Sequence, residues 1–134
     1  MESPRSTALC LSEMVGSLAV CRLGATAEIP DWATQGDFYS ITRTSDELSV
    51  VCSQGNVPAG VVCEKGWRSL KVEGPLDFGL TGILASIAGP LAEARISIFA
   101  LATFDTDYIL VKEEQYERAL AALSAGAHTI RRRE

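Results

Sequence analysis

The second half of the chain contains two segments with helical hydrophobic spacing, and strand-like segments lie before, between and after them. In residues 82–94 the side chains of Ile83, Ile87 and Leu91 recur on one helical face. In residues 113–126 two glutamates open the segment, an apolar stripe follows, and a glycine ends it. Strands are predicted at residues 67–73, 96–103, 107–111 and 128–130. The resulting order is strand, helix, strand, strand, helix, short strand.

That order is the βαββαβ arrangement of ferredoxin-like folds, an α+β class in which an antiparallel sheet carries both helices on one face. The first half looks like a degraded copy: after an irregular start over sixteen residues, it predicts a strand, a short helical turn after Pro30, and two further strands. We predict two tandem units, residues 1–65 and 66–134. The apolar run Ile98–Ala102 is expected to be buried on both faces of its sheet.

Composition limits the classes of partner. The formal net charge of −5 gives no electrostatic footprint for nucleic acid, and the run Arg131–Arg133 is interpreted as a solvated tail. The longest nearly uncharged stretch, residues 78–92, is shorter than the roughly 20 apolar residues that a membrane span needs. Four widely spaced cysteines and one histidine favour free thiols in a reducing cytosol over a zinc site. We therefore expect a cytoplasmic protein with no metal, nucleic-acid or membrane partner.

Enzyme signatures are absent from the sequence. It contains no nucleophile elbow, phosphate-binding loop, metalloprotease motif or dinucleotide-binding fingerprint. The histidine, His128, is interpreted as a surface or packing residue. Asp105 and Asp107 fall in a predicted hairpin turn, where aspartate is favoured for turn hydrogen bonding alone. We therefore predict a protein that is not an enzyme and needs no cofactor.

The glycine-rich segment between residues 74 and 83 is the strongest candidate site. It joins a strand to the start of a helix, where unpaired backbone N–H groups and the helix dipole favour an anion. The carboxylate of a small amino acid would suit this junction, and Asp77 would take its ammonium group. In the alternative interpretation Thr81 is only a helix cap and the glycines only shape the turn. From the residues alone, both interpretations stay open.

A family resemblance favours the first interpretation. Residues Gly82–Val111 resemble the ACT domains of aspartate kinases, although Thr81 stands in place of the usual proline and Arg95 in place of the usual glycine. Gly66–Ser86, Phe104–Val111 and the segment Ile29–Ala33 resemble a group of small bacterial proteins with two tandem ACT-like units. That group is in turn similar to the cytosolic arginine sensor of animals.

The resemblance implies a regulatory or sensor protein that binds a free amino acid between two ACT units and does no chemistry. It assigns the loop residues Leu76, Asp77, Phe78, Gly79, Leu80, Thr81, Gly82 and Ile83, and the hairpin residues Thr103, Phe104, Asp105, Thr106 and Asp107. In arginine-sensing relatives the position of Asp107 faces the basic end of the ligand, so a basic amino acid is slightly favoured. The resemblance also implies a homodimer or an intramolecular pair. The alternatives are a structural assembly module without a ligand and a small enzyme with an unrecognised site.

Overall fold

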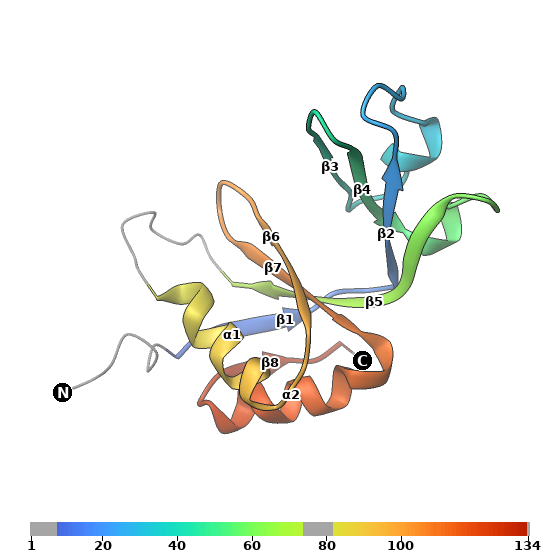
Figure 1. Ribbon diagram of the computed structural model, residues 1–134. Helices are drawn as coiled ribbons and strands as arrows, with labels where there is room; N and C mark the ends of the chain where they lie inside the picture. The colour runs from blue at the N-terminus through green and yellow to red at the C-terminus, as the bar shows by residue number, and fades with distance from the viewer. Residues whose placement is uncertain (1–7, 74–81, 134) are drawn as a thin grey trace. The chain divides into compact units, whose positions relative to one another are not determined.

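The computed structural model describes residues 8–73 and 82–133 (Figure 1). Its internal contacts divide the chain into two units. Gly16–Trp67 forms one, here called the small unit, and Met1–Val15 together with Arg68–Glu134 forms the other, the large unit. The predicted boundary between residues 65 and 66, and the ACT-like character of both halves, stay predictions.

The large unit is an α+β fold of the ferredoxin-like type. Its strands are β1 (Cys10–Glu13), the second part of β5 (Val62–Val72), β6 (Ile98–Ala102), β7 (Asp107–Lys112) and β8 (Thr129–Arg131), and its helices are α1 (Ile83–Glu93) and α2 (Tyr116–Ala125), the latter preceded by a 3₁₀ turn, η4 (Glu113–Gln115). The strands lie in the order β8-β1-β5-β7-β6. The predicted order of elements from β5 onward is confirmed.

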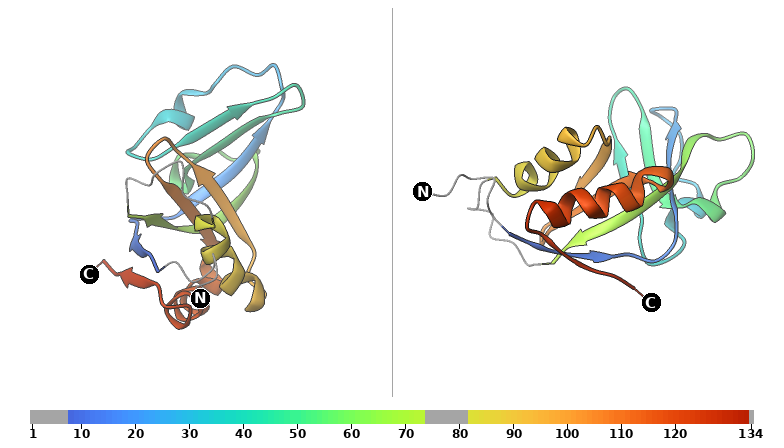
Figure 2. Two further views of the ribbon diagram at one scale, coloured as in Figure 1. Left: turned by 90° about the vertical axis from the view of Figure 1, so that its left-hand side faces the viewer. Right: turned by 90° about the horizontal axis from the view of Figure 1, so that it is seen from below.

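Both helices cover the same face of this sheet, as Figure 2 shows. A single buried cluster joins Ile87 and Leu91 of α1 and Leu123 of α2 to Leu70 of β5 and Ile109 of β7. The strand residues of this cluster alternate with side chains that point to the opposite face, because successive residues of a strand face opposite ways. The face of the sheet opposite the helices is called the open face below.

Strand β1 lies between the first and last strands of the βαββαβ unit. It runs antiparallel to β5, with Leu11 opposite Val72, and parallel to β8, with Leu11 opposite Ile130. The prediction of an irregular start was therefore wrong for residues 10–13. A strand of four residues with a glutamate at its end shows too little alternation to be recognised without its neighbours.

The prediction that Ile98–Ala102 is buried on both faces was also wrong. Ala100 and Ala102 are exposed, and the other three residues are only half-buried. The reason is position: β6 pairs with β7 and lies at the edge of the sheet order. A continuous apolar run implies burial on both faces for a central strand, not for an edge strand.

The small unit is an antiparallel sheet with little helix. Its strands are β2 (Leu18–Leu23), β3 (Ser40–Arg43), β4 (Leu48–Ser53) and the first part of β5, in the order β3-β4-β2-β5. The predicted helical turn after Pro30 is present as η2 (Asp31–Thr34), and its Ala33 is buried against Leu48 and Val50. A further turn, η3 (Gln54–Asn56), follows β4.

The four cysteines are free thiols, as predicted, and each lies in a strand. Among residues 8–73 and 82–133, no three acidic, cysteine or histidine side chains gather in a way that could hold a metal ion. None of the helices in that part of the chain has both the length and the apolar character of a membrane span.

Candidate functional site

The predicted hairpin residues form the turn between β6 and β7 in the large unit. The N–H of Thr103 donates to the carbonyl of Thr106 at 2.8 Å, and the N–H of Thr106 donates back to the Thr103 hydroxyl at 3.3 Å. Thr106 is only 4% exposed, and its hydroxyl donates to the carbonyl of Val72 at 2.5 Å. The turn is therefore fixed beside the end of β5, the strand that leads into the predicted ligand loop.

The two threonines, not the aspartates, make the internal hydrogen bonds of this turn. Asp105 is exposed and Asp107 is half-buried, and neither carboxylate has a hydrogen bond or ion pair among the described residues. Phe104 is 80% exposed. The turn therefore presents an aromatic ring to solvent, together with two carboxylates that make no hydrogen bond or ion pair within residues 8–73 and 82–133.

The other predicted residues lie at the start of α1. Gly82 precedes the helix with φ +79°, a left-handed conformation that favours glycine, and its carbonyl accepts the first helical hydrogen bond from Ser86 at 2.9 Å. Ile83 opens the helix and is buried. Leu76, Asp77, Phe78, Gly79, Leu80 and Thr81 lie outside the described residues. The site as a whole stays a prediction.

His128 fixes α1 in a way that sequence reasoning missed. The helix contains Pro90, which has no N–H to donate to the carbonyl of Ser86 one turn earlier. The Nε2 of His128 lies 2.8 Å from that carbonyl, while its Nδ1 accepts the N–H of Leu9 at 3.1 Å. Since Nδ1 is an acceptor, the proton of the neutral ring is on Nε2 and is donated to Ser86. The 4% exposed imidazole is a packing residue, as one of the two sequence interpretations had it.

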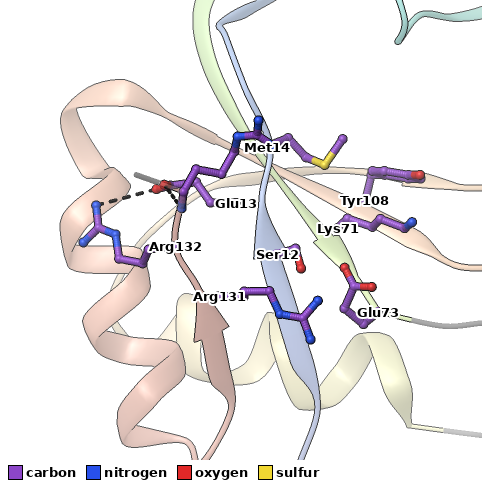
Figure 3. A pocket seen from close by; sticks show the side chains of 9 residues that line it. Ser12, Glu13, Met14, Lys71, Glu73, Tyr108, Arg131 and Arg132 are labelled. Carbon is purple, nitrogen blue, oxygen red and sulfur yellow. Dashed lines mark hydrogen bonds and ion pairs between the residues drawn. The ribbon is translucent and has the colours of Figure 1, made fainter.

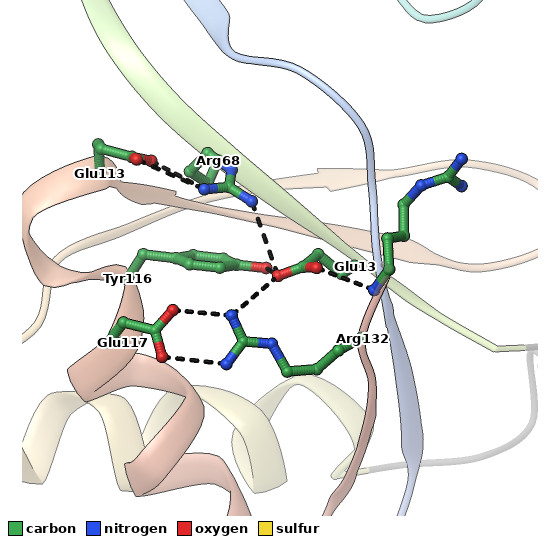
Figure 4. Close-up of polar contacts among 7 residues, drawn as sticks. Glu13, Arg68, Glu113, Tyr116, Glu117 and Arg132 are labelled. Carbon is green, nitrogen blue, oxygen red and sulfur yellow. Dashed lines mark hydrogen bonds and ion pairs between the residues drawn. The ribbon is translucent and has the colours of Figure 1, made fainter.

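Glu13 is the centre of a polar network in the large unit (Figure 4). One carboxylate oxygen accepts the hydroxyl of Tyr116 at 2.7 Å, and the other accepts the N–H of Arg133 at 2.9 Å. The guanidinium groups of Arg68 and Arg132 each lie 3.6 Å from the carboxylate. Glu13 is 7% exposed, so these partners compensate for the loss of water.

The network determines two protonation states. Burial acts to raise the pKa of Glu13, but the hydrogen bonds from Tyr116 and Arg133 and the two guanidinium charges outweigh it, so the pKa is lowered. Burial and the bond to Glu13 raise the pKa of Tyr116, which keeps its phenol a donor. The expected solvated tail is exposed but attached, because Arg132 also forms two hydrogen bonds with Glu117, at 2.8 and 3.0 Å.

Several known proteins are similar to this chain in fold and in sequence. A family model described as an ACT domain matches residues 62–125, and a second model, described as an N-terminal domain, matches residues 16–60. The protein Atu0741 from Agobacterium tumefaciens is 38% identical in sequence to this chain. Its crystal structure superposes on the chain with a TM-score of 0.91, and the match covers 96% of both chains. The chain contains an ACT domain at residues 62–125. The predicted resemblance is therefore confirmed.

Two further proteins are similar to this chain, one in sequence and one in fold. The protein named cytosolic arginine sensor for mTORC1 subunit 1, from Bos taurus, is 49% identical over 106 residues, which are 71% of this chain. The chain spans 30% of the length of that relative. The regulatory subunit of aspartate kinase from Thermus thermophilus is 13% identical, with a TM-score of 0.59 over 90% of this chain and 99% of the subunit, and shares the fold alone.

Proposed function

We propose that this ACT-domain protein is a cytoplasmic regulatory sensor that binds a free amino acid and does no catalysis. The observation that carries the proposal is the 49% identity to a protein named as an arginine sensor. The chain spans only 30% of the length of that relative. We therefore do not assign the downstream partner of the relative to this chain.

The proposed site in the large unit combines the start of α1 with the β6–β7 turn. The N–H groups at Gly82 and Ile83 precede the first hydrogen bond of the helix and suit the α-carboxylate of an amino acid. The loop residues Leu76–Thr81 directly precede them in the sequence and complete the proposed set. On the other side, Asp107 and Asp105 would take a positive group, which favours a basic amino acid such as arginine or lysine.

A thermal melt screen against the twenty amino acids tests the proposal. A ligand at one hundred times its dissociation constant adds about 2.7 kcal/mol to the free energy of unfolding. In a chain of this size that raises the melting temperature by about 5–10 °C. We expect one or a few amino acids, with basic ones foremost, to produce such a shift.

The variant Asp107→Asn tests the position of the site. It should weaken a basic ligand by about 1–3 kcal/mol, or roughly 5- to 150-fold in dissociation constant, because it removes a charge-assisted contact. The melting temperature without ligand should barely change, since Asp107 has no side-chain partner among the described residues. Asp46→Asn, at the turn between β3 and β4, is the matched control and should bind like the original protein.

The alternative function is an assembly module without a ligand. The half-exposed apolar residues of the edge strand β6 favour this second candidate. If no amino acid raises the melting temperature and calorimetry detects no binding, while the protein is oligomeric, the sensor proposal is wrong and the assembly function stands.

A further inference from the structure

The open face of the large unit contains a surface hollow of about 370 Å³ (Figure 3). Its lining includes Ser12 of β1, Lys71 of β5, Glu73 directly after β5, and Tyr108 of β7. Residues 131–133 form one side of it. The volume lies within the range of small-molecule sites, which starts at roughly 300 Å³. Of the residues proposed for the amino-acid site, those that the structure describes, Gly82, Ile83 and 103–107, do not line this hollow.

The hollow concentrates positive charge on an acidic protein. Four of the twelve basic residues of the chain line it, although the chain has a net charge of −5. Two of its lining groups are already paired: Glu13 belongs to the Tyr116 network, and Arg132 holds Glu117. The charged side chains that remain are three cations, Lys71, Arg131 and Arg133, and one anion, Glu73. Their net charge is two positive units.

The cations in the hollow have no partner in the described fold. No hydrogen bond or ion pair involves the side chains of Lys71, Arg131 or Arg133 among residues 8–73 and 82–133. Two other arginines of the large unit are paired: the half-buried Arg68 binds Glu113, and the exposed Arg118 donates to the carbonyl of Ala94. The hollow therefore keeps its charges available.

Ser12 adds an independent observation. Its hydroxyl oxygen is buried and has no hydrogen-bond partner among the described residues. The residues on either side, Leu11 and Glu13, face the helices, so alternation directs Ser12 to the open face and the hollow. A buried hydroxyl without a partner is unfavourable, and an acceptor oxygen in the hollow would relieve that cost.

We propose that this hollow binds a small dianion, a phosphate group or a dicarboxylate, through Lys71, Arg131 and the hydroxyl of Ser12. The ligand charge matches the two unpaired positive units. Its oxygens would accept hydrogen bonds from the ammonium, the guanidinium fork and the serine. Because the hollow's lining differs from the described part of the amino-acid site, this is a second ligand of the protein, and its binding does not depend on the proposed sensor function.

Titration followed by amide NMR tests the proposal, with inorganic phosphate and succinate as separate probes at low ionic strength. Saturable shifts should appear at Ser12, Lys71 and Arg131. The variants Lys71→Gln and Arg131→Gln should each weaken binding by about 3- to 10-fold, between the effects of an exposed ion pair and a charge-assisted hydrogen bond. Ser12→Ala should weaken binding without lowering the melting temperature. Arg95→Gln, an exposed arginine outside the hollow, is the control and should change affinity less than twofold.

The outcomes separate the two sources of a dianion. Saturation by phosphate alone identifies a phosphate-bearing ligand, saturation by succinate alone identifies a dicarboxylate, and either supports the proposal. The proposal is overturned if neither probe saturates at tens-of-millimolar concentration, or if Arg95→Gln weakens binding as much as Arg131→Gln. The second result would indicate diffuse attraction of anions. Neither result affects the amino-acid screen, so failures of the two proposals are distinguishable.

Discussion

His128 and Pro90 are energetically linked because the imidazole takes the carbonyl that the proline leaves without a donor. We expect His128→Leu to lower the free energy of unfolding by about 2–4 kcal/mol, since it leaves both the Leu9 N–H and the Ser86 carbonyl unpaired in a buried position. In a Pro90→Ala background the N–H of residue 90 can bond to Ser86. The same His128 substitution should then cost about 1 kcal/mol less.

Denaturant unfolding of the four proteins in this double-mutant cycle measures the difference. His128→Leu and Pro90→Ala are compared with the double variant and the original chain. Strictly additive effects would contradict a shared carbonyl and would leave His128 as a packing residue only.

The lowered pKa of Glu13 predicts an acid-dependent loss of stability. A carboxyl group whose pKa is lower in the folded state stabilises the fold above its unfolded pKa, here near 4.5, and loses that contribution as pH falls through the lower folded value. Glu13→Gln should therefore be less stable at pH 7 by about 1–2 kcal/mol. The difference from the original protein should shrink progressively below pH 4.5.

Chemical denaturation at several pH values between neutral and acidic checks this. Glu93→Gln, an exposed glutamate of α1, serves as the control and should follow the original protein at every pH. If the Glu13→Gln difference stays constant as pH falls, the ionised form of Glu13 is not what stabilises the network.

At the scale of elements, local signals predicted those elements that are defined by local features. Helix α2 has its opening glutamates and apolar stripe within its own sequence, and β4 was predicted at Leu48–Ser53 from its composition. The formation of strand β1 and the exposure of β6 depend instead on the position that each strand takes in the sheet. The four residues of β1 become a strand by pairing with β5 and β8, which lie some sixty and one hundred and twenty residues away.

The candidate site divides in the same way. Motif resemblance proposed the β6–β7 turn and the start of α1 as site residues, each a continuous segment of the sequence. It could not identify the links from Thr106 to Val72 or from His128 to Ser86, because these depend on tertiary packing. The buried Glu13 was missed for a related reason: a charged residue inside a short strand opposes the hydrophobic pattern, and its guanidinium and phenol partners are distant in the chain.

At the scale of the whole molecule, the two edges of the large unit differ in chemistry. Edge strand β8 includes Arg131, and charge on an edge opposes pairing with another chain. Edge strand β6 has the sequence IFALA, without charge, and its residues are half-buried or exposed. Among the described residues β6 has β7 as its strand partner, and an apolar edge without charge is the kind that associates with another chain. We therefore propose that β6 carries the association expected of an ACT protein.

The predicted consequence is a homodimer whose stability depends on β6. Light scattering at high protein concentration should give about twice the 14.3 kDa mass of the chain. Ala100→Lys places a charge in the exposed centre of β6 and should weaken the dimer by at least about tenfold, since a lysine on an edge strand disfavours edge-to-edge pairing. Ala121→Lys, an exposed alanine of α2, is the control and should leave the mass unchanged.

A monomer mass for the original protein would refute the homodimer, whereas a dimer insensitive to Ala100→Lys would move the interface away from β6. Because β6 also forms one side of the proposed amino-acid turn, loss of the dimer together with weaker amino-acid binding would indicate that association and sensing share this edge.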